Sequence, residues 1–309
     1  MKRLTTTLIL TTLALMVSAQ REVTSLNKDW SFHLGDAASM QADFTHGTEY
    51  FTYRAKAVGQ NKGPASIEFD DASWTHVVVP HDWVVDLPYD GKASHSHGYK
   101  QVGWKYPQNS IGWYRKHFSI DKKDEGKAIS IRFDGIFRNA QVFCNGFYLG
   151  TEPSGYASQE YNVSEYLNYG GDNVIAVRCD ATTEEGWYYE GAGIYRDTYL
   201  IKKDAQHYIN NVFYVWKDGR LNVKVEATCD YKNTLLDHEG KVVAEGKETL
   251  TLSNPHLWST DDPYLYTLKT STIGGEDAVC TKVGLRTLTF NAKEGVQAKI
   301  GRASCRARV

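Results

Sequence analysis

The sequence predicts an all-β protein of about two domains, and three observations lead to this fold class. Its 309 residues exceed one average domain and fit about two. Short apolar or alternating runs, rich in β-branched and aromatic residues, recur along the chain and are bounded by Gly, Asp or Asn. Long helical periodicity is missing after the first twenty residues. Short strands separated by regular turns are typical of sandwiches and barrels.

Composition excludes several classes of protein. Apolar residues make up 41% and charged residues 23%, which is typical of a folded chain and not of a disordered one. Lys and Arg number 35 against 37 Asp and Glu, a net charge of −2, so nucleic acid is not expected as a partner. The chain has no apolar run of the roughly 18 residues that a membrane span needs.

The first residues have the pattern of a secretory signal peptide over 1–19. Met1–Arg3 is basic, Leu4–Val17 is apolar with threonines, and Val17–Ala19 suits cleavage after small residues. The alternative is a buried core helix. We expect a mature chain that begins at Gln20 and is exported, either to a bacterial periplasm or as a secreted protein.

Strand patterns then follow in order along the chain. Four examples are Ala128–Phe133, Ala140–Asn145, Asn173–Cys179 and Leu221–Thr228. Asn145-Gly146 predicts a two-residue hairpin turn, because both residues tolerate a positive φ. Trp113 and Tyr114 are expected to pack in a sandwich core. A polar link at 202–206 follows the apolar run Tyr199–Ile201 and predicts a domain boundary. The segment 37–66 is polar and poorly periodic, and it predicts a long insertion loop.

The cysteines indicate no zinc site. The five are not arranged as CxxC and have no zinc-type spacing with His: Cys144, Cys179, Cys229, Cys280 and Cys305. Export would permit a disulfide between Cys144 and Cys179, but free buried thiols are the favoured interpretation.

Catalytic and cofactor motifs known from short patterns are absent. HExxH, GxxxxGK[ST], GxGxxG and GxSxG do not occur, and no cofactor or metal is expected. His95-Ser96-His97 predicts a solvated polar loop in preference to a metal site. Glu184-Glu185 predicts an exposed turn in preference to a catalytic pair.

Six short motifs occur in order between residues 79 and 287: Val79–Trp83 (VPHDW), Gly112–Phe118 (GWYRKHF), Phe133–Gly146 (FDGI…NG), Gly186-Trp187 with Gly193–Asp197 (GW…GIYRD), Asn254–Ser259 with Pro263–Tyr266 (NPHLWS…PYLY), and Gly284–Thr287 (GLRT). Together they resemble glycoside hydrolase family 2, the β-galactosidase and β-glucuronidase family. The resemblance implies a jelly-roll β-sandwich of sugar-binding type over 22–204 and a short immunoglobulin-like sandwich over 205–290. Because the second domain is short, we expect a lost or truncated strand and an exposed sheet edge.

The resemblance also implies where the chemistry lies. Retaining glycosidases use two carboxylates, which this family carries on a (β/α)8 barrel that follows the two sandwiches. Such a barrel needs roughly 200–250 residues, but only 19 follow Phe290. We therefore expect a non-catalytic N-terminal fragment of a β-glycosidase, most simply a β-galactosidase, that is inactive alone. The alternative is a stand-alone carbohydrate-binding or scaffold protein.

Four residues are candidates for contact with a β-galactoside-type glycan: Glu185, Trp187, Tyr188 and Glu190. In related hydrolases an Asp lies seven positions before the Ile of GIYR, but here that position is Trp187. A wider set of aromatic residues could stack on sugar rings: Trp83, Trp104, Tyr106, Trp187, Tyr188 and Tyr189.

The C-terminal residues depart from the family pattern. We expect 291–299 to begin the linker to the missing barrel. Residues 300–309 carry three arginines, no acid and no strand pattern, and they resemble the translation of a common sequencing adapter. They are interpreted as an artefact of adapter read-through, and the alternative is a native basic tail.

Overall fold

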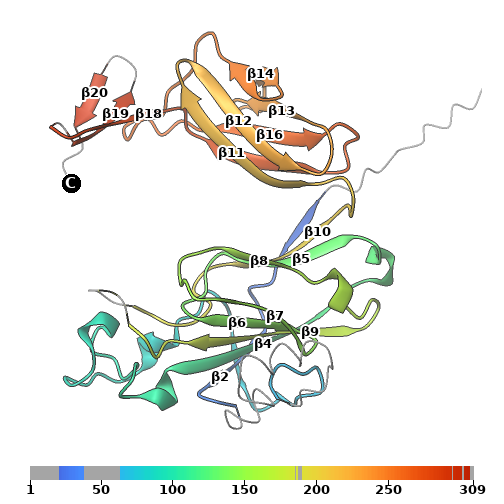
Figure 1. The fold of residues 1–309 in the computed structure, drawn as a ribbon, viewed down its shortest axis with the longest axis vertical. Coiled ribbons are helices and arrows are strands. Elements are labelled where there is room, and N and C mark those ends of the chain that lie inside the picture. Colours follow the sequence, from blue (N-terminus) through green and yellow to red (C-terminus); the bar gives the residue numbers. More distant parts are fainter. Residues whose placement is uncertain are drawn as a thin grey trace, which may run out of the picture. The chain divides into compact units, whose positions relative to one another are not determined.

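The computed structural model describes residues 21–37, 63–184, 186, 190–293, 295–300 and 303–306 (Figure 1). Over these ranges the chain forms β-strands and short 3-10 helices, with no α-helix, so the predicted all-β class is confirmed. No helix in the described part of the chain is long and apolar enough to cross a membrane. The chain separates into two compact units, Glu22–Ala205 and the residues from Gln206 onward.

Two antiparallel sheets build the first unit (Figure 1). The six-stranded sheet has the order β3-β2-β4-β9-β6-β7, and the four-stranded sheet has the order β1-β10-β5-β8. The strands are β1 Glu22–Ser25, β2 Trp30–Leu34, β3 Thr75–Val77, β4 Ile111–Ser119, β5 Ala128–Phe133, β6 Ala140–Cys144, β7 Phe147–Glu152, β8 Gln159–Asn162, β9 Asp172–Asp180 and β10 Thr198–Lys203. This is the expected jelly-roll sandwich.

The core of the first unit lies between these sheets. Ile129, Ile131 and Phe133 alternate along β5 and are fully buried, as the period of two in a strand requires. Tyr114 on β4 packs into the same cluster. Trp113 points to the other face of β4 and is also fully buried, in a smaller cluster with Phe143. Each of these large side chains contributes about 2 kcal/mol or more through burial.

Two local predictions in this unit are also confirmed. Asn145 and Gly146 adopt positive φ values of 49° and 87° and form the tight turn between β6 and β7. Cys144 and Cys179 are free and buried. Burial raises the pKa of the Cys144 thiol to about 12 and raises that of Cys179 further.

Five 3-10 helices lie between strands in the described part of the first unit. They are η1 Trp83–Asp86, η2 His95–His97, η3 Pro107–Asn109, η4 Lys122–Asp124 and η5 Ser164–Tyr166. Three of them fall in a single excursion, residues 83–110, between β3 and β4 (Figure 1). Most of the predicted insertion loop 37–66 lies outside the described residues.

The second unit is a sandwich of a three-stranded and a four-stranded sheet, with orders β11-β12-β15 and β14-β13-β16-β17. Its strands are β11 Ile209–Lys217, β12 Arg220–Ala227, β13 Tyr231–Leu236, β14 Val242–Gly246, β15 Thr249–Thr251, β16 Tyr266–Thr272 and β17 Ala278–Val283. Leu221 and Leu250 from one sheet meet Leu235 and Leu268 from the other in the core. The described residues form a seven-stranded immunoglobulin-like sandwich. No strand is lost, but β15 is only three residues long, which agrees with the expectation of a lost or truncated strand.

The residues after this sandwich form strands as well. β18 Thr287–Asn291, β19 Gly295–Ile300 and β20 Ala303–Arg306 pair in order as an antiparallel sheet. Local hairpin pairing satisfies the backbone hydrogen-bonding groups of these strands. The expected role of 291–299 as the start of a linker stays a prediction. The origin of residues 300–309 in adapter sequence stays a prediction.

Candidate functional site

Two of the sequence motifs meet through one carboxylate. Asp82, in the VPHDW turn, accepts hydrogen bonds at Oδ1 from the backbone N–H of Val84 at 3.0 Å and of Ala192 at 2.9 Å. The backbone N–H of His81 also donates to the carbonyl of Ile194 at 2.8 Å. The turn therefore positions the segment 191–194, which precedes Tyr195 and Arg196 of the second motif.

Glycine is required where these two segments cross. Gly193 has φ of 117°, and a Cβ there would lie 2.2 Å from the Tyr114 hydroxyl and 2.6 Å from the carbonyl of His81. A Cβ at Gly191 would lie 2.1 Å from Oδ2 of Asp82. Gly191 and Gly193 thus allow the two backbone segments to approach closely, and a side chain at either position would block this approach.

A polar pair, the half-buried His81 and the fully buried Tyr114, lies at this crossing. His81 Nδ1 and the Tyr114 hydroxyl are 2.8 Å apart. Burial lowers the pKa of His81, against the opposing effect of Asp82, and burial raises the pKa of Tyr114 well above its usual value. Both pKa shifts favour the neutral forms, and the hydrogen bond between His81 Nδ1 and the Tyr114 hydroxyl, whose direction follows the imidazole tautomer, holds the two side chains in place.

The excursion 83–110 holds the segment that leads into this crossing. The backbone N–H of Glu190 donates to the carbonyl of Ser96 at 2.7 Å, and the carbonyl of Glu190 lies 3.0 Å from Nδ1 of His97. The Ser96 hydroxyl donates to the carbonyl of Gly186. The expected solvated loop at His95–His97 is wrong for His97, which is fully buried because its ring binds this neighbouring segment.

A small pocket opens beside Asp82 and Glu190. Its volume is about 190 Å³, and its lining consists of Asp82, Phe137, Tyr156, Glu190, Gly191, Ala192 and Tyr195. Among the described residues, the lining combines two carboxylates with three aromatic rings and includes neither Lys nor Arg. Such a surface offers hydrogen-bond acceptors and flat apolar faces, which suit a neutral hydroxylated ligand.

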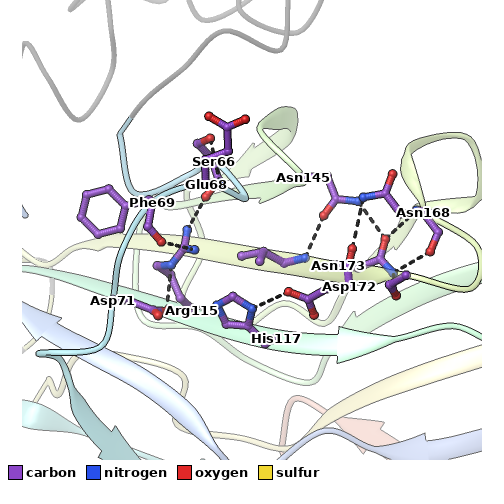
Figure 2. Close-up of polar contacts among 12 residues, drawn as sticks. Ser66, Glu68, Phe69, Asp71, Arg115, His117, Asn145, Asn168, Asp172 and Asn173 are labelled. Atoms are coloured by element: carbon purple, nitrogen blue, oxygen red, sulfur yellow. Dashed lines mark hydrogen bonds and ion pairs between the residues drawn. The ribbon is translucent and has the colours of Figure 1, made fainter.

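A second polar cluster lies on β4 and β9 and has a structural role (Figure 2). The fully buried guanidinium of Arg115 donates to Asp71 at 2.9 Å and to the carbonyls of Ser66 at 2.7 Å and Phe69 at 3.2 Å, and it also donates to the carbonyl of Pro64. Burial lowers the pKa of Arg115, and its hydrogen bond to Asp71 partly offsets this effect. The cluster holds the described end of the predicted insertion against the sheet.

Neighbouring side chains extend this cluster along β9 (Figure 2). His117 lies between two carboxylates, 2.8 Å from Asp172 and 3.5 Å from Asp71. Asn145 donates to Oδ1 of Asn173 at 2.8 Å. The described residues contain no group of three or more His, Cys, Asp or Glu side chains that could hold a metal ion.

Family profiles match both units of the chain. The sugar-binding domain of the family 2 glycosyl hydrolases matches residues 23–204, and the profile named for family 2 glycosyl hydrolases matches residues 201–286. The chain belongs to glycoside hydrolase family 2. The motif-based resemblance is therefore confirmed.

Family 2 relatives are longer than this chain. The β-galactosidase BoGH2A of Bacteroides ovatus is 34% identical over 307 residues, covering 89% of this chain and 33% of the relative. A β-galactosidase of Thermoanaerobacter pseudethanolicus is 30% identical over 241 residues, covering 67% of this chain and 32% of the relative. A β-glucuronidase of Formosa agariphila is 25% identical over 286 residues, covering 76% of this chain and 29% of the relative. The chain spans about a third of the length of these relatives.

Solved family 2 structures have the same fold. A β-glycosidase from Bacteroides vulgatus superposes with a TM-score of 0.71 and 28% identity, covering 90% of this chain and 35% of the other. A family 2 member from Bacteroides cellulosilyticus superposes with a TM-score of 0.68 and 25% identity, covering 89% of this chain and 37% of the other.

The family motifs of the second unit also meet in space. The guanidinium of Arg286 lies 4.5 Å from the ring of Trp258, and a Cβ at Gly284 would lie 3.0 Å from the same ring. Trp258 further donates its backbone N–H to the carbonyl of Leu285 at 3.0 Å. The NPHLWS and GLRT motifs thus form one packing arrangement in this chain.

The structure describes part of the predicted glycan site. Glu190 is 4% exposed and lines the pocket, while Glu185, Trp187, Tyr188 and Tyr189 lie outside the described residues. Trp83 is buried in the core, so its candidacy for sugar stacking is wrong, because its ring packs against Phe32 and Tyr114. Tyr106 donates its hydroxyl to Asp90, and Trp104 is 71% exposed.

Sequence reasoning missed the other pocket residues. Asp82 belongs to the VPHDW motif, but no local signal pairs it with a segment 110 positions later. Phe137, Tyr156 and Tyr195 come from three separate connections of the sandwich. The sequence does hold one signal for this pocket, because Asp82 and Tyr195 lie in two of the family motifs. Segments that a family shares include those that contact one another.

Proposed function

We propose that this chain is the N-terminal, non-catalytic part of a retaining β-glycosidase that acts on β-galactosides. One observation carries the proposal. Consecutive family 2 profiles match residues 23–286, while the chain spans only a third of its relatives. The β-galactoside specificity is supported by the 34% identity to a relative named as a β-galactosidase.

In this proposal the first unit supplies one wall of a sugar pocket, whereas the two catalytic carboxylates belong to the remainder of the enzyme. Glu185, Trp187, Tyr188 and Glu190 are the proposed substrate contacts. The backbone of Glu190 is held on both sides, through its N–H to Ser96 and its carbonyl to His97. A loop held in this way orients a substrate with little loss of conformational entropy on binding.

Export is part of the same proposal. The basic start, apolar stretch and small residues of 1–19 support a signal peptide, and a periplasmic or secreted enzyme would act on glycans outside the cytoplasm. The test is the N-terminal residue of the protein recovered from the expressing cells, which we expect to be Gln20. Recovery of an intact Met1 from a bacterial envelope fraction would contradict it.

The enzymatic test compares two proteins. The genomic locus is sequenced beyond codon 299, and both the present chain and the product of the full reading frame are purified. We expect the longer protein to hydrolyse a chromogenic β-galactoside faster than the matching β-glucuronide, and the present chain to hydrolyse neither. A genuine stop codon together with glycan binding would instead support a stand-alone carbohydrate-binding protein. Measurable turnover by the present chain would falsify the proposal.

A further inference from the structure

Exposed aromatic side chains gather on the excursion between β3 and β4. Tyr89 is 74% exposed, Tyr99 50% and Trp104 71%. They occur within sixteen residues of a segment that is otherwise well held by hydrogen bonds. Large flat side chains displayed from a rigid segment are a common form of recognition surface.

Hydrogen bonds place these three residues on one strip of backbone. Tyr89 forms an antiparallel bridge with Lys100, and the N–H of Asp90 donates to the carbonyl of Tyr99 at 2.9 Å. On the other side, the Tyr106 hydroxyl donates to Oδ2 of Asp90 at 2.6 Å. The short segment that carries Tyr89 is therefore flanked by the segments that carry Tyr99 and Trp104.

A tight turn holds Trp104 outward. The N–H of Tyr106 donates to the carbonyl of Gly103 at 2.9 Å, and Gly103 has φ of 99°, a conformation that favours glycine. The fully buried hydroxyl of Ser110 accepts from the N–H of Gly103 at 2.8 Å and donates to the carbonyl of Tyr106 at 2.7 Å. Both ends of the turn are anchored, so Trp104 is presented with a fixed backbone.

The ring of Tyr89 is supported from one side. The ammonium of Lys100 lies 4.0 Å from the ring centre, and it donates to the carbonyls of Val85 at 2.8 Å and Leu87 at 2.7 Å. Lys100 is itself buried. One face of the tyrosine ring therefore rests on a fixed cation, and most of the remaining ring surface is open to solvent.

We propose that these residues form a glycan-contact surface, on which Trp104 and Tyr89 stack against sugar rings of a β-linked oligosaccharide. The C–H faces of β-linked pyranoses are flat and apolar, whereas their hydroxyl edges need polar partners. The strip supplies both, since Lys105 follows Trp104 directly in the chain and donates to the carbonyl of Lys92 at 2.7 Å.

The inference deepens the proposed function and rests on it for the class of ligand. Ser96, within the same excursion, binds the backbone of Glu190 and of Gly186, so the aromatic surface and the proposed pocket wall are one structural body. A glycan long enough to contact both would gain affinity from two sets of contacts. The surface therefore indicates an oligosaccharide or polysaccharide as the substrate, in place of a simple disaccharide.

The test is affinity electrophoresis of the present chain in native gels that contain soluble β-1,4-galactan, xylan or hydroxyethyl cellulose. We expect at least one polymer to retard the chain. Trp104→Ala should weaken the retardation at least fivefold, Tyr89→Ala should weaken it partly, and Trp104→Phe should retain most of it. Phe290→Ala is the matched control, because Phe290 is 78% exposed in the other unit. Its migration should equal that of the wild type.

Two results would overturn the inference. One is wild-type migration without retardation in all three polymers, and the other is a Trp104→Ala variant that is retarded like the wild type. A thermal melt of each variant separates lost binding from lost folding. Failure of the proposed function has a different signature, because a gene without a catalytic barrel leaves glycan binding by this chain unchanged.

Discussion

The carboxylate of Asp82 accepts a hydrogen bond from the backbone N–H of Ala192 at 2.9 Å and thereby joins two family 2 motifs that are 110 positions apart. The same oxygen accepts from the N–H of Val84 and begins the 3-10 helix η1. One side chain thus fixes both the turn before the excursion 83–110 and the segment 191–194, which follows the candidate glycan contact Glu190.

Replacing Asp82 should loosen both segments. Asp82→Ala leaves two backbone N–H groups without their acceptor and should lower the free energy of unfolding by about 2–3 kcal/mol. Asp82→Asn retains a side-chain oxygen and should cost about half as much. Urea unfolding of the two variants checks this order. Equal stability of Asp82→Ala and wild type would show that the bond is not needed.

Gly193→Ala should be among the most destabilising single changes in the first unit. The positive φ of 117° costs about 1–3 kcal/mol for an L side chain, and the contact with the Tyr114 hydroxyl adds to it. Gly91→Ala is the matched control, because a Cβ at Gly91 would meet no heavy atom within 4 Å and the residue does not have a positive φ. Thermal melts should separate the two variants by several degrees. Similar melting temperatures would contradict the requirement for glycine at 193.

Arg115→Met should destabilise the first unit by about 3–5 kcal/mol. The change leaves Asp71 without its buried partner, and it removes the donor to the carbonyls of Ser66 and Phe69. Arg115→Lys should be nearly as harmful, because one ammonium cannot reproduce the fork of the guanidinium. Denaturant unfolding measures the loss, and Lys116→Met on the same strand should change stability little. If Arg115→Met unfolds at the same denaturant concentration as wild type, Arg115 does not anchor this segment to the sheet.

Stability should depend on Asp124 in a pH-dependent way. Burial acts to raise the pKa of this carboxyl, but hydrogen bonds from Lys127 at 2.7 Å and Lys202 at 2.8 Å outweigh burial and lower it. A carboxyl whose pKa is lower in the folded state contributes stability above its unfolded pKa of about 3.9, and the contribution is lost as the pH falls through the folded pKa.

We therefore expect Asp124→Asn to be less stable than wild type by about 2 kcal/mol at pH 7. The difference should shrink as the pH falls below about 4, where the wild-type carboxyl takes up its proton. Urea melts of both proteins between pH 7 and pH 3 measure it. Asp261→Asn serves as the exposed control. A difference that stays constant down to pH 3 would contradict a lowered pKa.

Much of the fold was predictable because the signals are local. The alternation of Ile129, Ile131 and Phe133 identifies a half-buried strand, and Asn145-Gly146 identifies a tight turn, whatever the rest of the chain does. The residue count of the second sandwich predicted a lost or truncated strand, and β15 is only three residues long. All seven strands are nevertheless present, because short connections suffice.

The candidate site was only partly predictable. The place of Glu190 before GIYR makes it a candidate, but its neighbours Asp82 and Phe137 are distant in sequence. The local sequence of His97 predicts exposure to solvent, yet the residue is buried, since its ring nitrogen binds a carbonyl 93 positions away. Trp83 and Trp104 look equivalent as candidates for sugar stacking, and only packing separates the buried ring from the exposed one.

The sequence by itself determined the all-β class, the family, the tight turn at Asn145-Gly146 and the burial of Trp113 and Tyr114, because each depends on short-range periodicity or on an ordered set of motifs. The tertiary structure alone decided which polar groups meet. Asp82 reaches Ala192, Arg115 reaches Asp71, and Ser96 reaches Glu190 through hydrogen bonds that span 44 or more positions. Such contacts depend on how the strands are ordered in the sheets, which no local pattern of residues encodes.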